Sequence, residues 1–282
     1  MKIVIWYCSI LILINCHIFA EDSLVNRDRI SLTLEDTSQI SVNAFIAPIE
    51  ITINNFHMEW DALANLRVNE PEKQHQTKVF QAFLPDKPVS VGELWKINAE
   101  GVLPLLQQLL PKPKYSMHID AGDSYGLLAC LRAYNDKYAD IVFRIHAEFE
   151  LKDGRFTPSQ FKGHLILDRM KKKVVFFNMY VPDGVINFDV GWKKYKDRNY
   201  SIIDSGVCTQ MELCSGRQDI LENIQFDESI TQQAAEMTLA HRFYSFYQIN
   251  WVPLDDALRL AQEQEKPIHV ISIDGPLNDE AC

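Results

Sequence analysis

The chain has 282 residues, of which 47% are hydrophobic and 23% charged, and its formal net charge is −10. This composition is typical of a folded globular protein and excludes a chain that is disordered as a whole. The acidic balance leaves no basic surface for phosphate groups, and no stretch interleaves aromatic residues with Lys and Arg. We therefore expect no nucleic-acid binding.

The first twenty residues have the layout of a secretory signal. Lys2 precedes an apolar run over residues 3–14, and Ala20 offers a small residue for cleavage before two acidic residues. The apolar run is shorter than the roughly 20 residues of a membrane-spanning helix. We predict that residues 1–20 are a cleaved signal peptide, with an uncleaved anchor as the alternative. Membrane association is expected only through this segment.

Alternating apolar residues predict half-buried strands in the next part of the chain. The period is two over residues 30–34, 40–44 and 49–53. A short helical stretch is expected around Trp60. A longer helix is expected over residues 102–110, where Pro104 is tolerable only in the first turn.

The clearest pattern lies in the middle of the chain, where apolar and polar residues alternate over residues 141–151. This predicts one strand with a core face and a solvent face. Arg144, His146 and Glu148 share the solvent face. They could form an acid–base site, but a solvated face is the preferred interpretation.

Three more strands are expected over residues 161–167, 174–181 and 186–192, because charged residues and a Pro-Asp-Gly turn separate these apolar runs. Together with the preceding strand, they predict an antiparallel meander. Asn199 then opens an Asn-Tyr-Ser sequon, a glycosylation site in a secretory compartment.

Removal of the signal would leave four cysteines, too few for a disulfide-stapled scaffold: Cys130, Cys208, Cys214 and Cys282. Cys208 and Cys214 are close enough in sequence to close a small loop in an oxidising compartment. A structural bridge or two buried free thiols is preferred over a redox pair. No Cys or His pair has metal-ligand spacing, so no metal site is expected.

The period changes near the carboxyl end. Apolar residues recur every three or four positions over residues 229–246, which predicts a helix, and a domain boundary is expected near Tyr247. A second helix before Pro267, a β-branched strand over residues 268–273 and a loop to Cys282 have the order that opens a thioredoxin-like domain. The expected fold is α+β, with a mostly antiparallel β domain and covering helices over residues 21–246. An incomplete thioredoxin-like segment over residues 247–282 follows it.

An ordered set of motifs resembles the selenoprotein N family. The motifs are VFRIHAEFEL at 142–151, FTPSQFKGHLIL at 156–167, the VP and N-x-D-x-x-W elements within 180–192, and QMEL at 210–213. The segment 251–282 is similar to the family segment that leads into its Cys-selenocysteine site. The resemblance covers residues 80–282.

The resemblance implies that Cys282 is catalytic, as the sulfur member of a pair whose selenocysteine would follow directly. No other cofactor is implied. It further implies a thiol/selenol oxidoreductase of the endoplasmic reticulum lumen or membrane, linked to redox protection and calcium homeostasis. Its partners would be oxidised lumenal or membrane proteins such as a calcium pump. The EF-hand-like pattern of vertebrate members is not found in this sequence.

Thiol exchange needs an attacking group and a resolving group, and Cys282 alone supplies only one of them. We therefore expect the sequence as it stands to be inactive, because it stops before the selenocysteine. The alternative hypothesis is a lumenal or secreted β-rich interaction module without catalysis.

Overall fold

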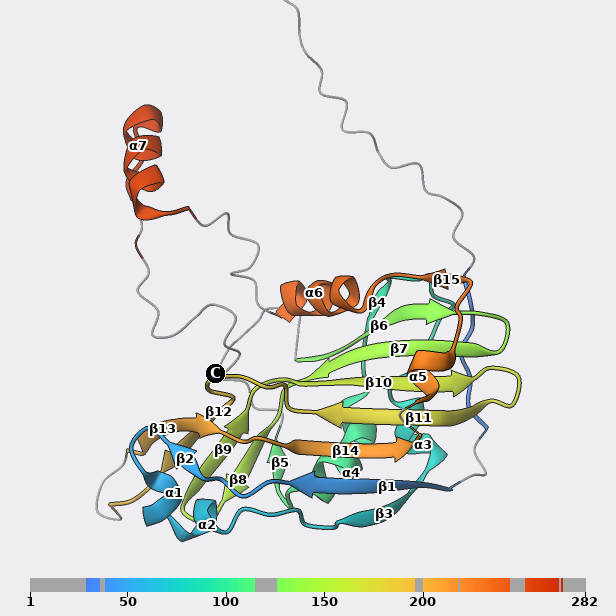
Figure 1. Ribbon diagram of the computed structural model, residues 1–282, viewed down its shortest axis with the longest axis horizontal. Helices are drawn as coiled ribbons and strands as arrows, with labels where there is room; N and C mark the ends of the chain where they lie inside the picture. Colours follow the sequence, from blue (N-terminus) through green and yellow to red (C-terminus); the bar gives the residue numbers. More distant parts are fainter. Residues whose placement is uncertain are drawn as a thin grey trace, which may run out of the picture.

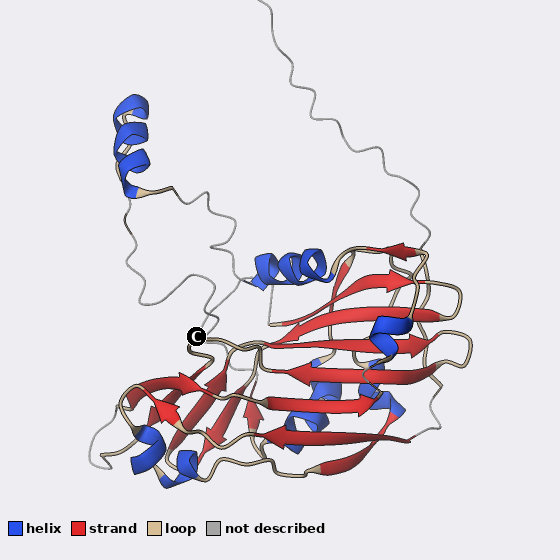
Figure 2. Ribbon diagram, in the orientation of Figure 1, coloured by secondary structure: helices blue, strands red, loops and turns tan. Residues whose placement is uncertain are grey.

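The computed structural model describes residues 29–35, 39–114, 126–195, 200–217, 219–243, 252–268 and 270. It is mostly antiparallel sheet with a few helices, which confirms the α+β prediction (Figures 1 and 2). The predicted signal peptide, Asn199, Cys282 and the boundary near Tyr247 lie outside the described residues. In the described part of the chain, no helix is long and apolar enough to cross a membrane.

The larger sheet has nine strands. They are β1 (Gln39–Ile46), β3 (Glu72–Gln76), β4 (Leu94–Lys96), β6 (Leu127–Tyr134), β7 (Tyr138–Ile145), β10 (Phe161–Asp168), β11 (Lys173–Tyr180), β14 (Met211–Gly216) and β15 (Glu228–Ser229). Their order is β15-β6-β7-β10-β11-β14-β1-β3, with β4 also pairing with β6. Every pairing is antiparallel, and β7, β10 and β11 form its long centre.

The smaller sheet has six strands and lies at one end of the larger one (Figure 1). In spatial order they are β2 (Ile51–Thr52), β13 (Ile202–Val207), β12 (Phe188–Trp192), β9 (Gly154–Pro158), β8 (Glu148–Leu151) and β5 (Pro113–Lys114). The short helices α1 (Phe56–Glu59) and α2 (Asp61–Ala64) pack beside it. Trp60 between them stacks on Trp192 of β12, with ring centroids 5.7 Å apart.

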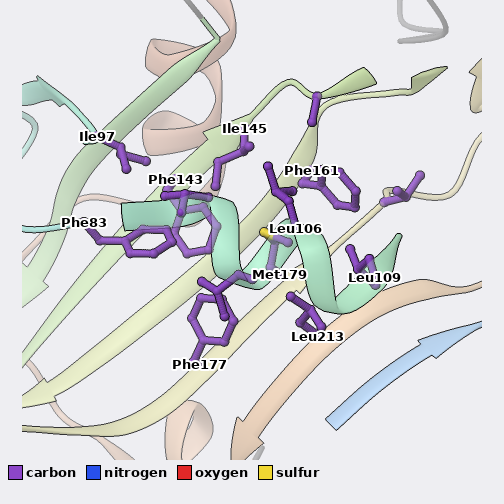
Figure 3. Close-up of a cluster of buried hydrophobic side chains, with 14 of the residues drawn as sticks. Phe83, Ile97, Leu106, Leu109, Phe143, Ile145, Phe161, Phe177, Met179 and Leu213 are labelled. Atoms are coloured by element: carbon purple, nitrogen blue, oxygen red, sulfur yellow. The ribbon is translucent and has the colours of Figure 1, made fainter. Parts of the chain in front are cut away.

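The main core lies between the larger sheet and helices α3 (Thr77–Gln81) and α4 (Ala99–Leu109). Figure 3 shows Leu106 and Leu109 of α4 directed at aromatic and apolar side chains of the central strands. The Phe143 ring lies 4.7 Å from that of Phe83 and 5.9 Å from that of Phe177. All five side chains are fully buried, so this cluster is the main apolar contribution to stability.

Helix α4 begins earlier than residue 102, where the sequence placed it. Asn98 caps it by accepting a hydrogen bond from the Gly101 amide at 3.3 Å, so the helix begins at Ala99. Pro104 therefore lies beyond the first turn, which corrects the prediction. One backbone hydrogen bond is missing there because proline has no N–H, and the buried leucines of the same helix offset that loss.

Two strand predictions are also corrected. The run 141–151 is not one strand, because it breaks at residues 146–147 and continues as β8 in the smaller sheet. The run 186–192 contributes β12, which pairs with β9 and β13 and not with β11. The antiparallel pairing of β7 with β10 and of β10 with β11 confirms the meander for these three strands. Period-two alternation identifies strands but does not reveal which sheet each strand joins.

Among the described residues, three helices follow the last long strand: α5 (Ile220–Asn223), α6 (Gln232–Phe243) and α7 (Leu254–Gln264). Helix α6 falls within the predicted helix 229–246. Helix α7 is present as predicted, and none of its residues is buried. The thioredoxin-like arrangement stays a prediction, because residues 271–282 lie outside the described part.

Gly163 in β10 offers a test of core packing. A Cβ atom there would lie 2.1 Å from the Asn178 carbonyl oxygen and 2.3 Å from the Phe143 ring. We expect Gly163→Ala to lower the free energy of unfolding by about 1–3 kcal/mol, because neither group can move without disturbing the core. Urea denaturation measures the change.

Gly191→Ala is the matched control for this substitution. Gly191 is also a strand glycine, but its added Cβ would meet only the flexible Arg155 side chain, at 3.0 Å. Its unfolding free energy should change by less than about 1 kcal/mol. Equal losses in the two variants would contradict the packing argument.

A buried histidine predicts loss of stability in acid. His75 of β3 is 3% exposed, and its Nε2 lies 2.8 Å from Gln108 Oε1 of α4. Gln108 donates its amide to the Val42 carbonyl oxygen at 2.7 Å, which leaves Oε1 to accept from the imidazole N–H. Burial lowers the pKa of His75 below its usual 6.5, since a buried imidazolium would be desolvated.

The unfolded chain therefore binds a proton at His75 at higher pH than the folded chain does. The stability that the neutral side chain contributes is present above the unfolded pKa and is lost as the pH falls toward the lower folded pKa. We expect His75→Gln to lose less unfolding free energy than the wild type between about pH 7.5 and about pH 5. Identical pH dependence in urea titrations would contradict this assignment.

Candidate functional site at the seam between the sheets

Between β7 and β14 the chain crosses between the two sheets at four places, and these crossings lie together. They are residues 146–147 between β7 and β8, 159–160 between β9 and β10, 181–187 between β11 and β12, and 208–210 between β13 and β14. We call them the seam. Backbone groups lose their ladder partners where a strand leaves a sheet, so polar side chains are needed there.

Asn187 joins two of the crossings. Its Oδ1 accepts from the Cys208 amide at 2.8 Å, and its Nδ2 donates to the Cys208 carbonyl at 2.9 Å and to the Pro182 carbonyl at 3.1 Å. Its own carbonyl accepts from the Ser159 amide at 2.8 Å, which adds a third crossing. Asn187 is 2% exposed, so these hydrogen bonds form away from water.

Arg144 and Gln160 make a second polar contact at the seam. Arg144 Nε donates to Gln160 Oε1 at 2.7 Å, and the two residues are 2% and 0% exposed. Gln160 Nε2 and the Ser159 hydroxyl have no hydrogen-bond partner among the residues that the structure describes. Ordered water is the usual partner of such buried groups, so the seam is a polar interior that the side chains satisfy only in part.

The prediction that the polar face of residues 141–151 is exposed to solvent is wrong. Arg144, His146 and Glu148 are only 2%, 1% and 8% exposed. His146 sits at a crossing, where its amide donates to the Gly126 carbonyl at 2.7 Å and its ring lies 5.7 Å from that of Phe243. Glu148 opens β8 and faces Arg155 at 3.6 Å. Helix α6 and the second sheet cover the face that the alternation assigned to water.

Sequence reasoning missed a second polar cluster on the same face of the larger sheet. Asp140 of β7 is fully buried and pairs through Oδ2 with Arg132 Nε of β6. Its Oδ1 lies 3.0 Å from His164 Nδ1 of β10. The only signal was an aspartate inside an otherwise apolar strand. Its partners lie on neighbouring strands and not nearby in sequence.

The cysteines within residues 21–246, which we call the body, are free thiols: Cys130, Cys208 and Cys214. Cys208 belongs to the main core, whereas Cys214 follows the buried Leu213 in β14 and therefore points to the other face of the sheet. The predicted bridge between Cys208 and Cys214 is absent for this reason. The alternative of free thiols is the one found, although Cys214 is only half-buried.

Burial suppresses the reactivity of these thiols. It raises the pKa of Cys130 to about 12 and that of Cys208 to about 11, and it also raises the pKa of Cys214. Thiol exchange requires the thiolate. Over the described ranges, no group of three or more His, Cys, Asp or Glu side chains is placed to hold a metal ion.

The cluster around Asp140 predicts a large effect of a single substitution. Asp140→Ala leaves the Arg132 charge without its carboxylate in a buried setting, so we expect a loss of about 3–5 kcal/mol in unfolding free energy. Asp136→Ala, in the exposed turn between the same two strands, should change it by less than about 0.5 kcal/mol. Similar losses in both variants, measured by urea denaturation, would show that the cluster does not hold the strands.

Comparisons with known proteins find that the chain is similar to selenoprotein N from three species. It is 32% identical to selenoprotein N of Danio rerio over 73% of its length, 25% identical to that of Homo sapiens over 93%, and 24% identical to that of Mus musculus over 93%. No family model matches, and no solved structure matches. The chain spans about half the length of these relatives, between 42% and 56%. The resemblance seen in the motifs is confirmed, and the chain is a homologue of selenoprotein N.

Proposed function

We propose that this protein is a thiol/selenol oxidoreductase of the selenoprotein N type, acting in the endoplasmic reticulum. Cys282 is the sulfur member of its redox pair, with selenocysteine directly after it, and residues 21–246 form the body that recognises the partner. Homology to selenoprotein N supports the assignment. The secretory-type segment at residues 1–20 supports the compartment.

The observation that carries the proposal is the raised pKa of the buried thiols in the body. With a pKa of about 11, the Cys208 thiol is ionised in about one molecule in ten thousand at pH 7. The Cys130 thiol is ionised even less, because its pKa is about 12. Neither can attack a disulfide at a useful rate in the folded body. The raised pKa values of these two thiols and of Cys214 favour a reactive group outside the folded body, and Cys282 occupies the family position for it.

The proposed chemistry is a two-step exchange. The selenolate attacks one sulfur of a target disulfide, which forms a selenium–sulfur bond and releases the other target sulfur as a thiolate. The Cys282 thiolate then attacks the same selenium, releases the second target thiolate and leaves a selenenylsulfide. The target gains two electrons and the pair loses two, so an external thiol must reduce the pair again.

A specific observation also favours the second candidate, a non-catalytic interaction module. Ile51 and Ile53 at the edge strand β2, and Met58 of α1, are 62%, 64% and 70% exposed. Exposed apolar side chains at a sheet edge suit a protein partner. Under the main proposal, the same surface would receive an oxidised lumenal or membrane protein, such as a calcium pump. That role would link the chemistry to calcium homeostasis.

Two linked measurements test the proposal. Sequencing the transcript after the Cys282 codon should show UGA followed by a reopened reading frame. The protein made with selenocysteine insertion, reduced beforehand and then freed of reductant, should reduce a disulfide probe in a single turnover, and Cys282→Ser should slow release of the second probe thiolate at least about tenfold. Cys208→Ser is the control that should retain the rate, provided that it remains folded.

Two outcomes would contradict the oxidoreductase. One is UAA or UAG after the Cys282 codon with no continuation, and the other is a reduction rate that Cys282→Ser leaves unchanged. Either result would make the interaction module the better interpretation. Binding of the body to a partner would then have to be shown without any disulfide exchange.

A further inference from the structure

Helix α6 is attached to the body by an apolar cluster of its own. Ala235 and Leu239 of the helix pack on Leu128 and Cys130 of β6 and on Val142 of β7. The neighbouring strand residues Ala129 and Phe143 belong to the main core instead. Because side chains alternate along a strand, the α6 cluster lies on the opposite face of the sheet from α3 and α4. The sheet itself separates the two apolar clusters.

Apart from the buried Phe243 ring, which lies 5.7 Å from that of His146, the rest of the contact beneath α6 is polar and incompletely packed. A hollow of about 250 Å³ lies between the helix and the sheet, lined by Arg144, Lys162, Gln233, Glu236, Met237 and His241. Across it, Lys162 Nζ lies 3.4 Å from Glu236 Oε2. Charged groups that regain water when they separate contribute little to holding two surfaces together. The attachment of α6 therefore depends mainly on its small apolar cluster.

Cys130 lies at the centre of that cluster and is fully buried. Its Sγ has a weak contact with the Leu131 carbonyl oxygen at 3.8 Å. Cys208 is also buried, at 2% exposure, but it belongs to the main core at the seam. The protein thus holds one thiol in a cluster that α6 covers together with Leu94 and Ile230, and another in the main core. The reactivity of Cys208 can therefore serve as the reference for that of Cys130.

We propose that α6 is a releasable cover, and that its release exposes Cys130 while the two sheets and the main core stay folded. Figure 1 shows α6 beside β6 and β7, on which its apolar side chains pack. Local opening costs only the contacts that are lost, and here those are the apolar side chains of one helix. Release also removes the burial that chiefly raises the pKa of Cys130, so the exposed thiol becomes ionisable and reactive.

This inference does not rest on the proposed oxidoreductase activity, since it concerns only the body. It assigns Cys130 as a conditionally exposed thiol, and α6 as the element that decides when an external reagent reaches it.

Alkylation of the native full chain tests the proposal. The protein is incubated with iodoacetamide without denaturant, and mass spectrometry follows Cys130 and Cys208 separately in the same sample. We expect Cys130 to react at least about tenfold faster than Cys208. Leu239→Ala should accelerate Cys130 by at least about tenfold more, while Cys208 changes by less than about twofold.

Two control variants separate release of α6 from general unfolding. Thr238→Ala removes a side chain of the same helix that belongs neither to the apolar cluster nor to the lining of the hollow, and whose hydroxyl donates to the Ala234 carbonyl within the helix; it should change neither rate. Leu165→Ala weakens the main core from β10, and it should accelerate both thiols. Hydrogen exchange gives an independent measure, because the amides of α6 should exchange faster than those of β10 in the wild type.

Equal alkylation of Cys130 and Cys208 in the wild type would overturn the proposal, since both thiols would then become accessible only through the same global opening. The same conclusion would follow if the amides of α6 and β10 exchanged together. If Leu239→Ala fails to fold, these two wild-type comparisons still decide the question.

Discussion

The hydrogen bonds of Asn187 are the interaction on which the arrangement of the two sheets depends. Between β7 and β14 the chain passes from one sheet to the other four times, and each crossing leaves backbone groups without a ladder partner. The Asn187 side chain satisfies both the amide and the carbonyl of Cys208, and its carbonyl takes the amide of Ser159. One buried residue thereby ties three crossings together, and the two sheets cannot separate without breaking it.

The same constraint gives a physical meaning to the motifs shared with selenoprotein N. The runs 142–151 and 156–167 contain the crossings at 146–147 and 159–160. The N-x-D-x-x-W element begins at Asn187, and QMEL begins at Gln210, the last residue of the crossing before β14. Motifs far apart in sequence therefore meet at the seam. Their polar residues are buried there because the strands break, and a surface role is not needed to explain them.

Apolar packing stabilises the body, and burial lowers the reactivity of its thiols. Burial keeps Cys130 and Cys208 protonated, so these thiols contribute to packing and not to exchange. That division is compatible with the proposed reactive pair outside the body. The residues that bury each thiol are therefore important, because uncovering a thiol changes its reactivity even when the bonded structure around the cysteine stays the same.

The sequence by itself determined the α+β class, most of the strands, the long helix near residue 100 and the family. These follow from local periodicity and from ordered motifs, both of which are properties of neighbouring residues. It did not determine which strands share a sheet, and it placed Arg144, His146 and Glu148 in water. Alternation shows that two faces differ, but what covers the polar face depends on α6 and a second sheet, which are distant in sequence.

The pairing of Asp140 with Arg132 and His164, and the separation of Cys208 from Cys214, were likewise decided by register across strands. Register is set by long-range pairing, and a shift of one residue moves every side chain to the other face. Local pattern therefore fixed the elements of this protein, whereas only the tertiary structure decided which polar groups are buried together and which thiols stay apart.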